Sequence, residues 1–271
     1  MRGEKHPFRR ATVIRGNYGP NPSSIAPVKG VILAGGSGTR LSPLTRITNK
    51  HLLPLYDRPM VTYAVEAFVE AGMRELMLVT GGTHAGEFFR LLGNGHEYGL
   101  DRLFYAYQDR PGGIADALGL AERFVDGDRC CVFLADNVFD DSLRPIVERF
   151  EAQEKGARVV LSQIDDDEHL HHLGVAELDG NRIRRIVEKP AEPPSRFAVT
   201  GAYFYDAQVW QVLPTLVASG RGELEITDVN NWYVERGEME ADVIEGFWGD
   251  AGESIEAYYE VNDFVRERRG R

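Results

Sequence analysis

The sequence has few cysteines and no long apolar run. Its two cysteines, Cys130 and Cys131, are adjacent in an apolar segment, where neighbouring thiols are poorly placed for a structural disulfide. No window approaches the roughly 18 apolar residues of a membrane span, and the N-terminus lacks the apolar core of a secretory signal. We therefore expect buried, reduced thiols in a cytoplasmic protein with no membrane partner.

Positive charge is also scarce. The 271 residues include 31 Lys and Arg against 42 Asp and Glu, for a formal net charge of −11. Several of the basic residues fall in 1–28, where "GNYGPNPSSIAP" is typical of a flexible extension. An acidic body is a poor nucleic-acid surface, so we expect no nucleic-acid partner. A polyanionic ligand would need a local cationic pocket or a metal ion.

Apolar, strand-like runs alternate with helical patterns from residue 29 to about residue 156. Residues 61–69, for example, repeat apolar side chains at helical spacing between Pro59 and Gly72. This order predicts an α/β fold with a Rossmann-like, mixed, mostly parallel sheet flanked by helices. Ligands of such sheets bind beyond the carboxyl ends of the strands.

Strands follow one another with fewer helices from about residue 157 to 271. We expect this part to form a smaller α+β region that completes a site built on residues 29–156. Helices are predicted over 114–124, 206–218 and 225–236, and after Gly252. The acidic run "DDDEH" that precedes His171 and His172 predicts a solvated loop.

A glycine-rich loop, "GGSGTR", follows the first apolar strand. Glycines allow close approach of the backbone to a ligand, and exposed N–H groups can cradle phosphate oxygens. Leu41 stands where the dinucleotide fingerprint needs its last glycine, and the Lys-Ser/Thr pair of a Walker loop is missing. Arg40 and Lys50 nevertheless supply fixed positive charge beside this loop.

Longer motifs resemble a known family. "LAGGSGTRLSPLT" followed by "NKHLLPL" is similar to the signature of sugar-1-phosphate nucleotidyltransferases, and most of all to the short glucose-1-phosphate thymidylyltransferases. Further matches extend in order to about residue 265. They are "YQDRPGGIADALGLAE", "LADNVF", "GVAEL", "EKPAEPPSRFAVTGAYFYD", "RGELEITDVNNWY" and "WGDAG".

The resemblance implies that dTTP and α-D-glucose 1-phosphate give dTDP-glucose and pyrophosphate. A sugar-phosphate oxygen would displace pyrophosphate directly at the α-phosphorus, with Mg²⁺ and without a covalent intermediate. Positioning and electrostatics would supply most of the catalysis. A homo-oligomer, dimer or tetramer, is also implied.

The same resemblance implies a nucleotide site. Arg40 would hold the β- and γ-phosphates and Lys50 the α-phosphate region, and with Lys189 they form the catalytic set. Gln108 would read the base, since its amide both donates and accepts. The expected nucleotide-binding residues are Leu33, Gly35, Gly36, Gly38, Thr39, Arg40, Gln108, Gly113 and Asp136.

A sugar-phosphate site and a metal site complete the implied set. Lys189 and Arg221 would clamp the sugar phosphate. Asp136 ends an apolar strand and pairs with Asp250 as the expected ligands of Mg²⁺, which needs few carboxylates when phosphate oxygens complete its shell. The expected sugar-phosphate-binding residues are Asn137, Gly174, Glu188, Lys189, Val199 and Arg221.

Five positions depart from the family pattern: His51, Asp116, Ala135, Gly249 and Glu253. An ionised Asp116 cannot donate a hydrogen bond as the usual glutamine can, so these departures leave nucleotide preference open. Two alternatives therefore remain: the same chemistry with UTP or another hexose 1-phosphate, and a sugar-nucleotide sensor without catalysis.

Overall fold

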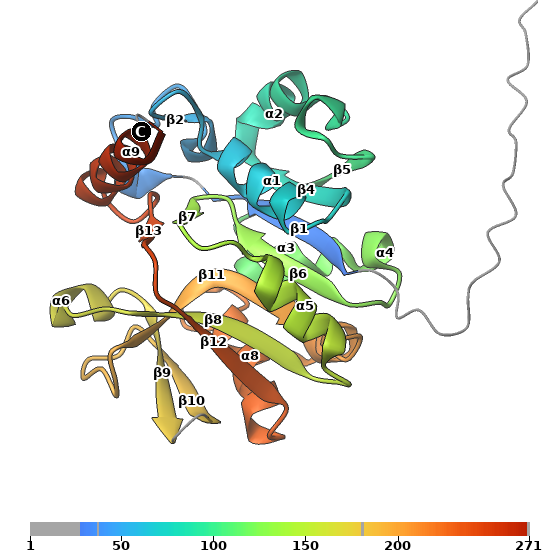
Figure 1. Ribbon diagram of the computed structural model, residues 1–271, viewed down its shortest axis with the longest axis vertical. Helices are drawn as coiled ribbons and strands as arrows, with labels where there is room; N and C mark the ends of the chain where they lie inside the picture. Colours follow the sequence, from blue (N-terminus) through green and yellow to red (C-terminus); the bar gives the residue numbers. More distant parts are fainter. Residues whose placement is uncertain (1–27, 37, 180–181, 270–271) are drawn as a thin grey trace, which may run out of the picture.

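A nine-stranded sheet with helices on both faces forms the centre of the molecule (Figure 1). The computed structural model describes residues 28–36, 38–179 and 182–269. The predicted extension over 1–28 lies outside the described residues except for Val28. The α/β fold with its mixed sheet, predicted from the alternation of patterns, is confirmed.

Four parallel strands form the first half of this sheet, in the order β6 (Cys130–Leu134), β1 (Lys29–Ala34), β4 (Glu75–Gly81) and β5 (Arg102–Gln108). Strands buried on both faces read as continuous apolar runs, as "VILA" and "CCVFL" do. Their carboxyl ends lie at one edge, so the glycine loop, Gln108 and Asp136 come together there.

Antiparallel pairing dominates the second half. β11 (Phe197–Tyr205) pairs antiparallel with β6 and joins the two halves into one sheet. β8 (Ala157–Gln163) and β9 (Gly174–Asp179) also pair with β11. β10 (Arg182–Glu188) lies beside β9, and β12 (Met239–Ile244) runs parallel to β8. The boundary predicted near residue 156 stays a prediction, because the sheet is continuous across it.

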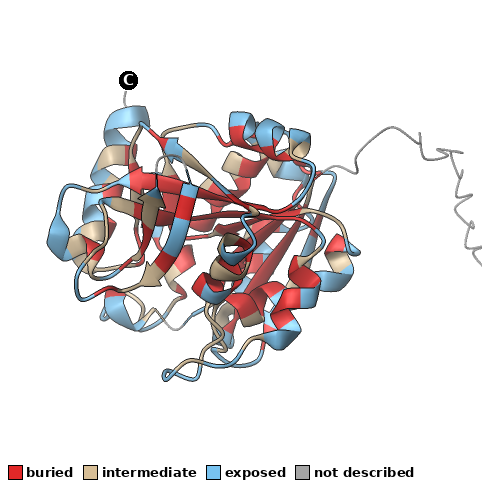
Figure 2. Cartoon of the chain, turned by 90° about the horizontal axis from the view of Figure 1, so that it is seen from below, coloured by how far each residue is buried: buried red, intermediate tan, exposed pale blue. Residues whose placement is uncertain are grey.

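The two faces of the sheet carry separate apolar cores (Figure 2). On β1, Ile32 and Ala34 belong to one core, while Val31 and Leu33 belong to the other. This alternation is the period of two expected of a strand. The first core holds α1 (Val61–Glu70), α2 (Ala85–Leu92) and α5 (Arg144–Ala152), and the second holds α3 (Ile114–Gly119), α4 (Glu122–Val125), α7 (Val209–Val212) and α8 (Ile226–Glu235).

The C-terminal segment returns to the first half of the molecule. β13 (Trp248–Asp250) pairs with β7 (Asn137–Phe139), and α9 (Ile255–Arg269) packs beside the small hairpin of β2 (Pro54–Leu55) and β3 (Arg58–Pro59). The register places Asp250 opposite Asn137. Two stretches more than 100 residues apart in sequence are thus brought side by side at the edge of the sheet.

Three local predictions were wrong. The helix expected over 206–218 is α7 followed by a 3₁₀ turn at Leu213–Thr215, because Pro214 cannot continue an α-helix. The helix expected over 114–124 is interrupted between α3 and α4. The acidic run expected as a solvated loop contains the short helix α6 (Asp167–Leu170). The remaining 3₁₀ turns are Thr39–Leu41, Lys50–Leu52, Gly82–His84 and His96–Tyr98.

The two cysteines lie in the interior of the sheet. Cys130 and Cys131 are buried and free, as predicted, and burial raises the pKa of both thiols. Within the described ranges, no helix combines the length and apolar character needed to cross a bilayer.

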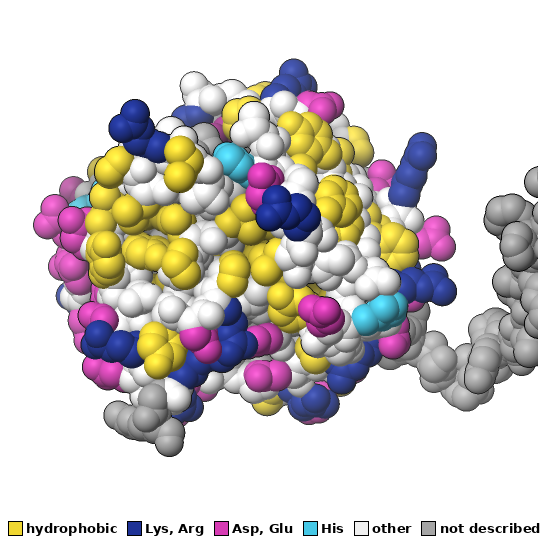
Figure 3. Space-filling model, turned by 90° about the horizontal axis from the view of Figure 1, so that it is seen from above, with side chains coloured by type: hydrophobic (Ala, Val, Ile, Leu, Met, Phe, Trp, Pro, Cys, Tyr) yellow, Lys and Arg dark blue, Asp and Glu magenta, His cyan; other side chains and the backbone are white. Residues whose placement is uncertain are grey.

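Figure 3 shows acidic and basic side chains interspersed on one end of the molecule.

Candidate active site

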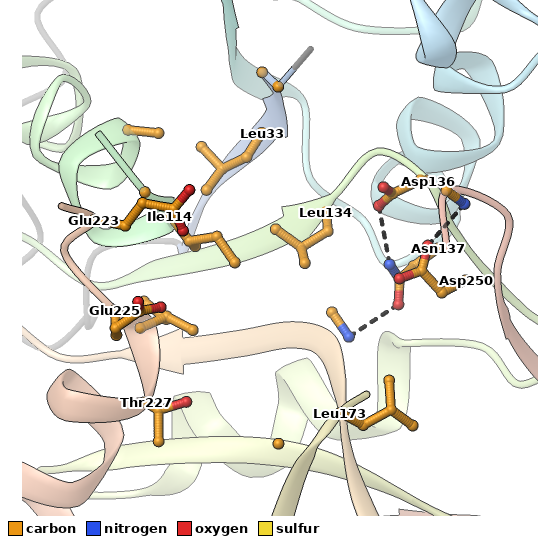
Figure 4. Close-up of a pocket in the computed structure, with 18 of the residues that line it drawn as sticks. Leu33, Ile114, Leu134, Asp136, Asn137, Leu173, Glu223, Glu225, Thr227 and Asp250 are labelled. Atoms are coloured by element: carbon orange, nitrogen blue, oxygen red, sulfur yellow. Dashed lines mark hydrogen bonds between the residues drawn. The ribbon is translucent and has the colours of Figure 1, made fainter. Parts of the chain in front are cut away.

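A cavity of about 440 Å³ lies at the carboxyl ends of β1 and β6, between the two halves of the molecule. Figure 4 shows Asp136, Asn137 and Asp250 grouped at one end of it and Ile114 with Glu223 at the other. Leu33 and Leu134 lie between these groups. Every residue predicted for the site lines this one cavity, although the role of each stays a prediction.

The glycine loop lies against the cavity with a backbone that few other residues could adopt. Gly36 and Gly38 have φ of 96° and 64°, in the left-handed region that glycine occupies without strain. A Cβ on Gly38 would also lie 3.0 Å from Thr45 Cγ2. Arg40 follows on the 3₁₀ turn, exposed and lining the cavity. The loop therefore offers bare backbone beside a guanidinium.

Lys50 and Asp136 form a largely buried ion pair inside the cavity. Burial alone would lower the pKa of Lys50, but attraction to Asp136 and Asp250 outweighs it and raises the pKa above its usual value. Burial would raise the pKa of Asp136, yet Lys50 holds it well below the usual range. Both groups are therefore charged at neutral pH.

The pKa of Asp250 is shifted in the opposite direction to that of Asp136. Burial and repulsion from Asp136 raise the pKa of its carboxyl to about 7. Its Oδ1 accepts a hydrogen bond from the Gly252 N–H at 2.8 Å. A Cβ on Gly252 would lie 2.4 Å from Asp136 Oδ2 and 2.7 Å from Lys50 Nζ, so a glycine is needed where the loop closes over the pair. Two carboxylates that repel each other gain from a shared cation.

Asp136 and Asp250 fit Mg²⁺ better than a metal that needs an all-protein cage. Among the described residues, no group of three or more His, Cys, Asp or Glu side chains could hold a metal ion. Magnesium accepts one or two carboxylates when waters and substrate phosphates fill its other positions. The two aspartates line a cavity that is large enough to admit such phosphates.

His51 lies next to Asp136 and is uncharged: its Nε2 is 3.8 Å from Asp136 Oδ2. Burial and the neighbouring Lys50 lower the pKa of its imidazole to about 3. Its ring Nδ1 lies 2.9 Å from Asn49 Oδ1, which also accepts the His51 backbone N–H at 2.9 Å. The histidine that departs from the family pattern thus adds no positive charge next to Lys50.

Asn137 holds the acidic end of the cavity together. Its Nδ2 donates to Asp136 Oδ1 at 3.1 Å. Its Oδ1 accepts from the Gly201 N–H at 3.0 Å and from Trp248 Nε1 at 2.6 Å. The side chain therefore joins the turn between β6 and β7 to β11 and β13, and the predicted contact with the hexose stays a prediction.

The predicted sugar-phosphate residues form a second, more exposed charged group. Lys189 Nζ lies 3.9 Å from Glu188 Oε1, and Arg221 lies 3.8 Å from the same oxygen. Thr227 donates to Glu188 Oε2 at 2.8 Å and fixes this carboxylate. Burial and the nearby Arg221 lower the pKa of Lys189. An anion bound between the two cations would relieve their repulsion.

Several lining residues were not predicted. Tyr203 lies on β11, and Thr227 and Asn230 lie on α8. Asn230 Oδ1 accepts from the Tyr205 hydroxyl at 2.6 Å, and its Nδ2 is a buried donor with no partner in the part of the chain that the structure describes. Thr227 and Asn230 are polar residues three apart on an otherwise apolar helix face, and this pattern could have indicated that they line the site.

The remaining departures lie close to Asp250, in or near the loop that follows β13. A Cβ on Gly249 would lie 2.5 Å from Val261 Cγ2, so the close packing of α9 requires glycine there. His169 Nε2 lies 2.7 Å from Glu253 Oε2, and its ring is parallel to that of Trp248. The hydrogen bond to Glu253 raises the pKa of His169. Glu253 thus ties the loop after β13 to α6, while Ala135 is fully buried.

Comparisons with known proteins identify the family of the chain. A family model described as nucleotidyl transferase matches residues 29–268. A glucose-1-phosphate thymidylyltransferase of Neisseria meningitidis is 41% identical over 243 residues, covering 88% of this chain and 83% of that protein. The enzyme of the same name from Actinoplanes is 40% identical, covering 88% and 78%.

Solved structures lead to the same family. A Bacillus anthracis protein assigned to the glucose-1-phosphate thymidylyltransferases, in complex with sucrose, has a TM-score of 0.83 and 46% identity over 88% of this chain and 95% of that one. A UDP-glucose pyrophosphorylase with bound UDP-glucose has a TM-score of 0.77 and 25% identity, covering 89% and 99%. The chain belongs to the nucleotidyl transferase family, as its motifs predicted.

Proposed function

We propose that this nucleotidyl transferase condenses dTTP with α-D-glucose 1-phosphate to give dTDP-glucose and pyrophosphate. The observation that carries the proposal is the single cavity in which Lys50, Asp136 and Asp250 lie within reach of the cations Arg40, Lys189 and Arg221. Relatives of that name, about 40% identical over 88% of the chain, support the substrate pair.

The residues divide the work by charge. The glycine loop and Arg40 hold the outer phosphates of the nucleotide, and Lys50 contacts the α-phosphate. Lys189 and Arg221 hold the sugar phosphate so that one of its oxygens faces the α-phosphorus in line with the departing pyrophosphate. Mg²⁺, held by Asp136 and Asp250, would neutralise charge on the phosphates. Glu188, fixed by Thr227, accepts hydrogen bonds from hexose hydroxyls.

One alternative keeps the chemistry and changes the nucleotide. UTP presents the same hydrogen-bonding edge as dTTP, and the solved UDP-glucose pyrophosphorylase has the same fold. The two nucleotides differ by a methyl group on the base and a hydroxyl on the ribose, which hydrophobic contacts discriminate only weakly. A sensor without catalysis is disfavoured because Lys50 and both aspartates are in place.

A panel of nucleotides and sugar 1-phosphates tests the proposal by pyrophosphate release in the presence of Mg²⁺. We expect kcat/KM for dTTP with glucose 1-phosphate to exceed that of every other pair by about tenfold. An equal or higher value for UTP would transfer the assignment to that nucleotide. Binding of dTTP without release from any pair would favour the sensor.

The proposal carries two further predictions. We expect a homo-oligomer, dimer or tetramer, in solution, which light scattering coupled to gel filtration would measure. We also expect a cytoplasmic protein, which fractionation of the source cells would test. A monomer at micromolar concentration would remove the first of these predictions and leave the reaction unaffected.

A further inference from the structure

The side-chain amide of Gln108 faces two groups that can only accept hydrogen bonds. Its Nε2 lies 2.7 Å from Asp116 Oδ2 and 3.2 Å from the Gly113 carbonyl oxygen. A carboxylate and a carbonyl cannot donate to an amide oxygen. The nitrogen must therefore lie on this side, and both of its hydrogens are used.

The oxygen of the same amide is left for the cavity. A Cβ built on Gly35 would lie 3.0 Å from Gln108 Oε1, so this oxygen points towards the glycine loop. Gln108 is 8% exposed, and it lines the cavity together with Gly35 and Gly113. A buried side chain with both hydrogens engaged presents one function to a ligand, that of an acceptor, and not the donor and acceptor together that the sequence led us to expect.

Asp116 is itself held firmly behind Gln108. It lies in the first turn of α3, with its carboxylate over Gly112, where a Cβ would come within 2.4 Å of Oδ2. The Gly112 carbonyl accepts from the Leu224 N–H at 2.8 Å, and the Ala115 N–H donates to the Leu224 carbonyl at 3.2 Å. Asp116 does not line the cavity. It can act on a ligand only through Gln108.

We propose that Asp116 is a positioning residue that fixes the orientation of the Gln108 amide and thereby restricts the site to bases with a ring N–H donor. This inference rests on the proposed function. Thymine and uracil carry such a donor at N3, and Gln108 Oε1 accepts from it. Cytosine carries a lone pair at the same atom, which would face the oxygen of Gln108 and leave two acceptors opposed.

Asp116 stands where the family pattern has glutamine, and this difference restricts the orientation of Gln108. An amide side chain at residue 116 could donate to Gln108 Oε1 as well as accept from Nε2, so only the longer contact with the Gly113 carbonyl would then oppose the reversed orientation of Gln108. The carboxylate of Asp116 permits only the orientation in which Gln108 Nε2 faces it. The orientation of Gln108 is thus set by the chemistry of its neighbour.

The test uses Asp116→Asn, which preserves shape and removes the obligate acceptor. Pyrophosphate release is measured with dTTP and with dCTP at saturating glucose 1-phosphate, and with varied glucose 1-phosphate at saturating dTTP. We expect the ratio of kcat/KM for dTTP over dCTP to fall about tenfold, mainly through KM for the nucleotides, while KM for glucose 1-phosphate is unchanged. Asp109→Asn is the matched control, because it makes the same charge change at an exposed neighbouring position.

Two further measurements keep the outcome decisive. Asp116→Ala, which leaves the Gly113 contact alone, should give an intermediate ratio, and it replaces Asp116→Asn if that variant does not fold. Calorimetric binding of dTTP and dCTP to the wild-type protein measures base selectivity without turnover. A wild-type ratio retained by both Asp116 variants would overturn the inference and leave the proposed function standing. Failure of the wild-type protein to bind dTTP would remove both.

Discussion

Lys50 and Lys189 occupy the same cavity in opposite electrostatic settings. The Lys50 side chain is 17% exposed and is paired with Asp136, which raises its pKa. Lys189 is 31% exposed, and burial together with Arg221 lowers its pKa. The first lysine is neutralised by the protein itself. The second lysine lies beside another cation, Arg221, and its Nζ is 3.9 Å from Glu188 Oε1, too far for a hydrogen bond, so its charge is left for an anion.

This contrast teaches which charges hold the fold and which serve the ligand. A buried pair is costly to break, because removing one partner leaves the other charge desolvated. A half-exposed cation is screened by solvent and contributes little to stability. Both lysines should matter for catalysis, but mutation of the buried Lys50 should also change the free energy of unfolding.

Lys50→Met should have the largest effect. It removes the cation beside the α-phosphate, so kcat/KM should fall about 10²- to 10³-fold. It also leaves Asp136 buried without its partner, so the free energy of unfolding should fall by about 3 kcal/mol. Pyrophosphate release and urea unfolding measure the two effects. Lys155→Met, at an exposed ion pair with Glu238, is the control and should change neither.

Asp250→Asn should separate activity from stability. Activity should fall about 10²-fold, because one of the two proposed ligands of Mg²⁺ is weakened. Without the metal, the variant should be as stable as wild type or more so, since the repulsion between Asp250 and Asp136 is removed. Thermal unfolding in EDTA measures this. A marked loss of stability would show that the carboxylate of Asp250 is a structural group.

Lys189→Met should weaken substrate binding without weakening the fold. KM for glucose 1-phosphate should rise by roughly tenfold or more, since one phosphate contact is lost. Urea unfolding should be nearly unchanged, in contrast to Lys50→Met. If Lys189→Met destabilises the protein as strongly as Lys50→Met, the distinction between the two lysines fails.

The Mg²⁺ requirement should depend on pH. The carboxyl of Asp250 has a pKa of about 7, so protons compete with the metal below that value. The apparent Mg²⁺ affinity should therefore rise with pH, by up to about tenfold per unit below pH 7, and level off above it. Pyrophosphate release during Mg²⁺ titrations between pH 6 and 8.5 measures this. Asp250→Asn should flatten the profile.

His169→Gln should have the smallest effect. Glu253 raises the pKa of His169, so the folded protein favours the charged ring. The contribution of this pair to stability is fully present below the unfolded pKa of about 6.5 and is lost as pH rises through the folded value. The difference in Tm between wild type and variant should therefore be measurable at pH 5.5 and absent at pH 9. An equal difference at both values would contradict the ion pair.

Much of the site was predictable because its residues lie in long local motifs. The glycine loop with Arg40, and the carboxylate of Asp136 just after β6, are each specified by a few consecutive residues at the carboxyl end of a strand. The short helix α6 and its contact with Glu253 were not predictable. Four acidic residues in a row are typical of a solvated loop, and the partner of His169 lies 84 residues away.

The sequence by itself determined the α/β architecture, the family and the chemical types at the site, because periodicity and consecutive motifs are local properties of the chain. Tertiary structure decided which charges meet. Pairing of β7 with β13 brings Asp250 to Asp136 and raises its pKa, and the placing of Asp116 behind Gln108 fixes the direction of an amide. Neither is written in the sequence, since desolvation and hydrogen-bond direction depend on atoms that only folding brings together.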